Sequence, residues 1–176
     1  GGNSEIIRST DISLQFIRLC GIIIENNKMI KIIKYEYYVL ITANQYKNNE
    51  KENKKDNIYY DVEFYVNENK NNNNNNNNNA SKILPKKEDL HYYSFDKTII
   101  TGNERGEISR VGDICRKFSE ILLAKDIALE LEKEDIIILD NSLRAYYTNE
   151  ELYWKELFEI VIKNKIILAG LTKTTT

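Results

Sequence analysis

The sequence predicts an α/β fold on a mixed sheet, with antiparallel strands first and a helix–strand–helix–strand series after them. Three observations support this prediction. Long runs of β-branched and aromatic residues lie before residue 67, and a segment rich in helix formers spans residues 113–133. Two short apolar runs, residues 136–140 and 165–171, flank a second helical segment, which is typical of parallel strands. The 176 residues are enough for one domain.

The first two apolar runs are expected to form a hairpin. Residues 15–24 have high β propensity, and Gly21 within them could mark a bulge or a turn. The polar link at residues 25–28, ENNK, has turn chemistry, and residues 29–42 continue as a β-branched and aromatic strand. A third strand is predicted at residues 57–66, where apolar and acidic side chains alternate. Its apolar face holds Tyr60, Val62, Phe64 and Val66, and its other face holds Asp61 and Glu63.

An asparagine tract follows this third strand. Residues 67–79 cannot bury enough apolar surface to offset the loss of chain entropy. We therefore expect residues 67 to about 87 to be a disordered insertion, with a nucleic-acid-binding or aggregation-prone tract as the alternative. After the insertion, Asp113 is a suitable N-cap for the first helix, and Thr148 opens the second. The strand at residues 136–140 lacks a polar face, which predicts burial on both faces.

The composition limits the classes of function. A formal net charge of −2 excludes a global basic field, so nucleic-acid binding would depend on local patches. Cys20 and Cys115 are too isolated to suggest disulfides, and the sole histidine, His91, has no neighbour with which to bind zinc. The apolar runs are far shorter than the roughly 20 residues that span a bilayer. We expect a soluble, cytoplasmic protein without a membrane segment.

Two carboxylates stand out from these patterns. Arg116, Lys117 and Glu120 fall on the helix stripe that is otherwise apolar further along, and a buried glutamate needs a partner. An ion pair between Arg116 and Glu120, four residues apart, is the simplest explanation. Asp140 ends the apolar run at residues 136–140, where α/β folds collect catalytic groups, although it could also cap a turn in DNSL.

A helix and the strand that follows it are neighbours in such folds, so Glu120 and Asp140 are expected to lie close together. Two close carboxylates repel unless a cation lies between them. Mg²⁺ and Mn²⁺ suit such oxygen ligands, and nucleases use them to activate water.

Four segments in this order resemble the motifs of the NurA nucleases. They are Gly1-Gly2-Asn3-Ser4, Arg116-x3-Glu120, Asp140-Asn141-Ser142-Leu143, and LAGLTKT at residues 168–174. In NurA proteins, Asp-Gly-Ser ends the first strand, Arg-x-x-x-Glu lies on the following helix, and Asp-Gly-Ser-Leu ends the next parallel strand. A lysine before serine or threonine follows the strand after that. The resemblance covers nearly the whole chain outside residues 46–91.

The resemblance implies an RNase H-like domain over residues 1–176 and a divalent-metal-dependent DNA nuclease that processes DNA ends in repair. Single-stranded DNA or duplex ends would be the substrate, Mn²⁺ or Mg²⁺ the cofactor, and a HerA-type helicase the partner of a homodimer. By motif position, Glu120 and Asp140 would be catalytic metal ligands. Arg116 would orient Glu120 or contact the substrate, and Lys173 would reach a phosphate.

The sequence departs from the NurA pattern at several positions. Asn141 replaces the usual glycine, which is tolerable because asparagine accepts left-handed backbone geometry. The aspartate expected directly before Gly1 has no counterpart, and neither have the family's later aspartate and histidine. His91 lies in the wrong place to substitute. We therefore expect a fragment of a larger domain, truncated at both ends, with an incomplete active site.

Two other interpretations stay open. The chain could be a non-catalytic RNase H-like module that docks a helicase or a dimer partner. It could also be a small globular domain whose acidic residues serve as solvation and caps. In a nuclease, Arg105, Arg110, Arg116 and Lys117 would supply local contacts to DNA, although Arg105 and Arg110 fit ordinary loop solvation equally well.

Overall fold

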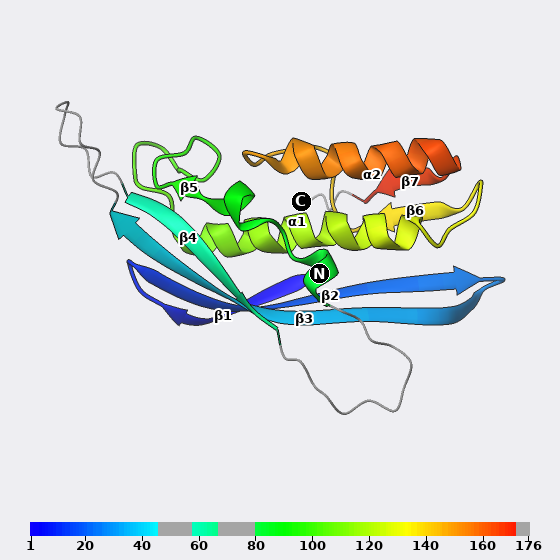
Figure 1. The fold of residues 1–176 in the computed structure, drawn as a ribbon, viewed down its shortest axis with the longest axis horizontal. Helices are drawn as coiled ribbons and strands as arrows, with labels where there is room; N and C mark the ends of the chain where they lie inside the picture. Colours follow the sequence, from blue (N-terminus) through cyan, green and yellow to red (C-terminus); the bar gives the residue numbers. More distant parts are fainter. Residues whose placement is uncertain (46–57, 67–79, 172–176) are drawn as a thin grey trace, which may run out of the picture.

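A computed structural model of the chain describes residues 1–45, 58–66 and 80–171. They form an α/β fold with a five-stranded antiparallel sheet, a two-stranded parallel sheet and two α-helices. Helix α1 lies over one face of the five-stranded sheet, and α2 lies beyond α1 together with the parallel pair (Figure 1). The strands are β1 Gly2–Arg8, β2 Ile12–Glu25, β3 Lys28–Gln45, β4 Ile58–Tyr65, β5 Tyr92–Tyr93, β6 Ile136–Leu139 and β7 Ile167–Gly170. The helices are α1 Ser109–Ala128 and α2 Glu150–Asn164, with 3-10 helices at Ala80–Ile83 and Lys87–Leu90.

The predicted hairpin is confirmed as β2 and β3, which pair antiparallel up to Glu25 and Lys28 at the turn. The two turn residues, Asn26 and Asn27, have φ angles of 49° and 61°. These left-handed values are what a two-residue hairpin turn needs, and asparagine adopts them more readily than most residues. The ENNK link therefore forms the predicted turn, and a bulge between Ile23 and Ile24, rather than at Gly21, shifts the register of the remaining β2–β3 pairs.

Alternating burial directs one face of the sheet toward α1. In β4, Tyr60 and Val62 are buried and Glu63 is exposed, which confirms the alternation predicted there. The β2 and β3 residues with the same orientation are buried as well. The core between the sheet and α1 includes Ile17, Leu19, Tyr37, Val39, Ile41, Tyr60, Ile114, Phe118 and Ile121.

Strand β1 has no counterpart among the predicted strands. All seven of its residues are exposed, and its pairing with β2 shifts register between Glu5 and Ile7. A strand without a buried face leaves no alternating pattern in the sequence. Its place in the sheet therefore depends on backbone pairing and on polar contacts.

Helix α1 begins and ends earlier than expected. It starts at Ser109 rather than at the predicted N-cap Asp113, and Ile108, the residue before it, has helical backbone angles and no side-chain cap. Asp113 instead accepts a hydrogen bond from Asn3 on β1. The helix ends at Ala128, short of residue 133, and Glu134 in the following turn has a φ angle of 73°.

The single mixed sheet predicted from the sequence is wrong. Strands β6 and β7 pair with each other in parallel, and in the described part of the chain the antiparallel strands form a sheet of their own. Burial of β6 on both faces is also wrong, because Ile136 and Ile138 are 59% and 60% exposed while Ile137 is buried. Only one face of β6 joins the hydrophobic core.

The predicted disordered insertion ends earlier than expected. Residues 67–79 lie outside the described residues, but residues 80–87 belong to ordered structure that begins with the 3-10 helix Ala80–Ile83. Ile83 and Leu90 are fully buried, so this segment contributes to the core. The polar tract before Ala80 led the sequence analysis to extend the insertion to about residue 87, although Ile83 lies within this range and is buried.

Candidate functional site

Glu120 is contacted by two segments that are far from it in the sequence. Its side chain lies on α1 and is 12% exposed. The Oε1 atom lies 3.2 Å from the N-terminal ammonium of Gly1, and Oε2 accepts a hydrogen bond of 3.1 Å from Nδ2 of Asn141. The residue before β1, helix α1 and the loop after β6 therefore meet at this carboxylate.

Arg116, one turn earlier on α1, completes the surroundings of Glu120. Its Nη1 atom donates a hydrogen bond of 2.6 Å to Oε1 of Glu120, so the predicted ion pair is present. Arg116 Nε and Asn141 Oδ1 are buried and have no hydrogen-bond partner among the described residues. The contact is consistent both with an orienting role for Arg116 and with a plain ion pair.

Asp140 follows β6 directly and is exposed to solvent. It lines the same groove as Gly1, Glu120 and Asn141, and this groove has a volume of about 850 Å³. The structure thus places both predicted carboxylates along one groove. The side chain that bonds to Glu120 from the loop is that of Asn141.

The donor chemistry of this groove suits a hard cation in part. Two carboxylates and the buried amide oxygen of Asn141 are ligand types that Mg²⁺ and Mn²⁺ accept. Across residues 1–45, 58–66 and 80–171, however, no group of three acidic, histidine or cysteine side chains is placed to hold a metal. The guanidinium of Arg116 forms an ion pair with Glu120 instead. A bound metal would need further ligands.

The other predicted DNA contacts do not gather around Glu120. Lys173 lies outside the described residues. Arg105 donates to the hydroxyl of Tyr60 at 2.7 Å, and Arg110 donates to the Thr101 hydroxyl at 2.9 Å. These local contacts fit the alternative of ordinary loop stabilisation.

Lys117 is 7% exposed, so the prediction that it contacts DNA is wrong. Its Nζ atom lies 3.9 Å from Oε1 of Glu150 and 5.3 Å from the centre of the Trp154 ring. Burial lowers the pKa of Lys117, while the nearby Glu150 carboxylate raises it. The residue belongs to the contact between α1 and α2.

The buried Glu150 was not singled out by the sequence patterns. Its carboxylate accepts hydrogen bonds from the backbone N–H groups of Tyr146 and Tyr147 at 2.8 and 3.1 Å, and from the Trp154 indole at 2.9 Å. An acidic residue in the first turn of a helix suits the helix dipole. Nothing in the spacing of the surrounding residues marks this one as fully buried.

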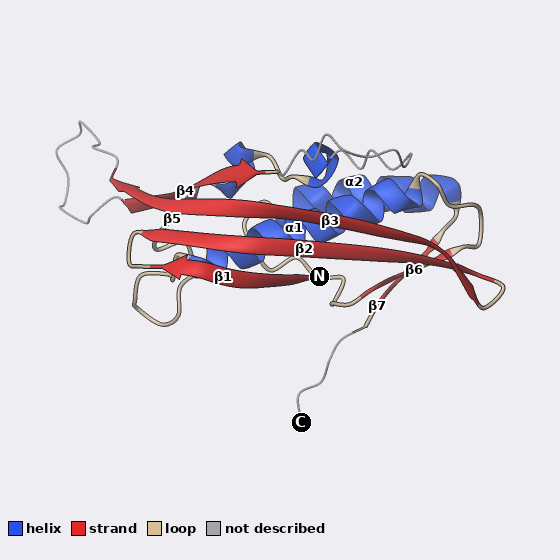
Figure 2. Cartoon of the chain, turned by 90° about the horizontal axis from the view of Figure 1, so that it is seen from below, coloured by secondary structure: helices blue, strands red, loops and turns tan. Residues whose placement is uncertain are grey.

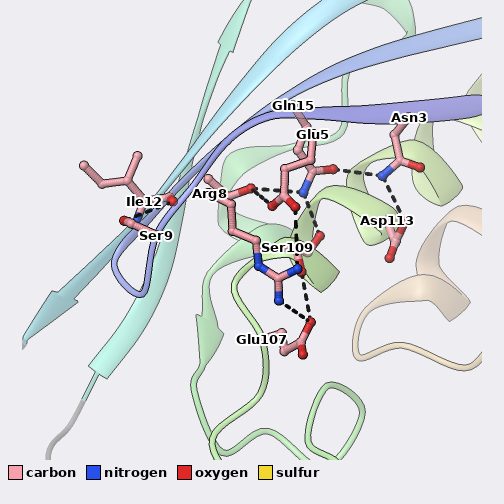
Figure 3. A network of polar contacts seen from close by, with 10 residues as sticks. Asn3, Glu5, Arg8, Ser9, Ile12, Gln15, Glu107, Ser109 and Asp113 are labelled. Carbon is pink, nitrogen blue, oxygen red and sulfur yellow. Dashed lines mark hydrogen bonds and ion pairs between the residues drawn. The ribbon is translucent and has the colours of Figure 1, made fainter.

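A polar network joins β1 to the start of α1 (Figure 3). Asn3 donates hydrogen bonds to Oε1 of Gln15 at 2.8 Å and to Asp113 at 3.0 Å. Gln15, which is 1% exposed, donates in turn to the backbone carbonyl of Ser109 at 2.8 Å. The network fixes β1 on the helix and so helps to keep Gly1 beside Glu120.

Comparison with protein-family models, curated proteins and solved structures gives no match. A functional interpretation therefore depends on the groove itself and on the motif resemblance.

Proposed function

We propose that the chain belongs to a divalent-metal-dependent DNA nuclease with an RNase H-like, NurA-like architecture. The observation that carries this proposal is the meeting of three motif segments in one groove. Gly1, the Arg116–Glu120 pair and Asn141 are in direct contact, and Asp140 lines the same groove. Two carboxylates, Glu120 and Asp140, therefore line the same groove.

In this proposal Glu120 and Asp140 hold Mn²⁺ or Mg²⁺, which would supply an activated water for phosphodiester hydrolysis. Arg116 keeps the Glu120 carboxylate in position through its 2.6 Å hydrogen bond, and Asn141 does so from the loop after β6. Lys173 would contact a phosphate of the substrate. The solvent-exposed part of the Arg116 guanidinium would also contact a phosphate of the substrate.

The proposed substrates are single-stranded DNA and duplex ends, and the proposed partners are a HerA-type helicase and a second copy of the chain. The motif resemblance supports these assignments, as it does a cytoplasmic role in DNA end resection and repair. Among the described residues, no helix is long and apolar enough to cross a membrane.

A non-catalytic interaction module is the second candidate function. It is favoured by the 2.6 Å ion pair that Glu120 already forms with Arg116. In that case the groove would be a structural feature, and the acidic residues would have no metal to bind.

The decisive experiment, in the full-length protein, compares Glu120→Gln and Asp140→Asn with Glu159→Gln, an exposed control on α2. Mn²⁺ binding is measured by calorimetry, and degradation of end-labelled linear DNA is measured with and without Mn²⁺. The nuclease proposal predicts at least a tenfold loss of both in the two groove variants, or about 1.4 kcal/mol, with an unchanged control. Unchanged DNA degradation in either groove variant would refute the site. A full-length wild-type protein that neither binds Mn²⁺ nor degrades DNA would favour the interaction module.

A further inference from the structure

Helix α2 lies on the side of α1 that faces away from the five-stranded sheet (Figure 1). Figure 2 shows the same arrangement from the sheet side, with the sheet in front of both helices. One side of α2 is buried against the rest of the fold, and the opposite side is exposed. This exposed side carries three large apolar residues, Leu152, Phe158 and Ile162, which are 51%, 37% and 75% exposed. Three such residues on one helix are more than the scattered apolar exposure of an ordinary surface.

An open groove of about 370 Å³ runs along α2 beside the loop that follows β6. Leu143 and Ala145 line it from the loop, and Trp154, Phe158 and Ile162 line it from the helix. The rings of Trp154 and Phe158 are stacked, with their centres 5.6 Å apart. An apolar surface of this kind, bordered by charged residues, is typical of a site that binds another protein.

The charged residues on this side of α2 alternate in sign. Glu151, Lys155 and Glu159 follow one another at intervals of four residues, so they lie along one face of the helix. Opposite charges at this spacing often pair within a helix. In the described part of the chain, however, the ion pairs of α2 are made by Glu150 and Glu156, and both reach lysines of α1. The three exposed charges are therefore available to another molecule.

The pattern on α2 is complementary to itself when the helix is reversed about its middle residue, Leu157. The reversal places Lys155 opposite Glu159 and Leu152 opposite Ile162. Phe158, next to the middle, comes to lie near its own counterpart. A parallel pairing in register would instead place like charges opposite each other. Complementarity under a twofold rotation is the property of an interface between two identical subunits.

We propose that the exposed face of α2 binds the same face of a second copy of the chain, with the two helices antiparallel about a twofold axis at Leu157. Lys155 of each copy then pairs with Glu159 of the other. Ile162 of each copy packs against Leu152 and the groove beside Trp154 of the other. A helix of 15 residues is about 22 Å long, so the interface is small and the dimer should dissociate in the micromolar range. This inference rests on α2 and not on the nuclease assignment, which names a second copy without a surface.

The test exchanges charges across the interface in the full-length protein. Lys155→Glu places two carboxylates opposite each other, and Glu159→Lys places two ammonium groups opposite each other. Each single variant should weaken dimerisation at least tenfold in sedimentation equilibrium, and the double variant should restore it. A mixture of the two single variants should form a heterodimer, because both positions then face an opposite charge. A role of these residues in stabilising their own helix predicts no such recovery on mixing.

Lys34→Glu is the matched control, because it reverses an exposed charge on β3, which lies on the other side of α1. It should leave dimerisation unchanged, whereas Ile162→Asp should weaken it, with wild-type unfolding midpoints in circular dichroism for both. A wild-type protein that stays monomeric well above micromolar concentration would overturn the proposal. So would single variants that dimerise like wild type, or a mixture that stays monomeric. DNA degradation is measured separately, so loss of the interface and loss of the nuclease assignment are distinguishable.

Discussion

Replacing Gly112 with alanine tests how closely β1 and β2 approach α1. A Cβ atom at this helix position would lie 2.0 Å from Oε1 and 2.2 Å from Cδ of Gln15. The Gln15 amide cannot simply swing into solvent, because it is buried and bonded to Asn3 and to the carbonyl of Ser109. The substitution must therefore displace this amide or push the helix away from the sheet.

The expected cost follows from three terms. Overpacking of a buried site costs about 1–3 kcal/mol. Loss of the Gln15 hydrogen bonds with Asn3 and with the Ser109 carbonyl adds about 1 kcal/mol each, and the higher helix propensity of alanine returns about 1 kcal/mol. The net destabilisation is about 2–4 kcal/mol, which lowers the thermal midpoint by roughly 4–16 °C in a chain of this size.

Urea and thermal unfolding, followed by far-ultraviolet circular dichroism, measure this effect. Gly2→Ala is the control, because nothing lies within 4 Å of a Cβ at that position. In a Gln15→Ala background the colliding atoms are gone, so Gly112→Ala should become neutral or slightly stabilising. A wild-type midpoint for Gly112→Ala, or the same cost in both backgrounds, would refute the reasoning.

Two further predictions concern buried groups. Glu150→Ala should destabilise the chain by about 3 kcal/mol in urea unfolding, because it leaves the Trp154 indole and two backbone donors unpaired. The exposed neighbour variant Glu151→Ala should stay within about 0.5 kcal/mol of wild type, and equal costs would contradict the capping role. Burial raises the pKa of Tyr92 above its ordinary value of 10.0, so the protonated form is favoured in the folded state. The stability contributed by the buried, protonated Tyr92 is fully present below pH 10 and is lost as the pH rises further. Tyr92→Phe should therefore flatten the loss of stability measured between pH 9 and 11. An unchanged slope would exclude this tyrosine as a cause.

Elements whose residues face the core were the ones that the sequence could predict. The hairpin, β4 and the second helix each have a buried side that imposes a period of two or of 3.6 on the apolar residues. Strand β1 is exposed throughout and imposes no period, so its position was not predictable. The start of α1 was misplaced because Asp113, which resembles a cap, is used to bind Asn3 on β1.

The error at β6 has a different cause. A run of isoleucines predicts burial on both faces, and the described residues cover only one of them. The composition of β6 is therefore that of an interior strand, while its surroundings are those of an edge.

One part of the site could be predicted from the sequence, because a helix and the strand that follows it lie next to each other in such folds. Adjacency predicted that Glu120 and Asp140 lie close together, and in the structure both line one groove. It could not predict that Asn141 would donate to Glu120, or that Lys117 would be buried against Glu150, because the direction of a side chain depends on packing between elements. The ion pair with Arg116 could be predicted because it is local, four residues along one helix.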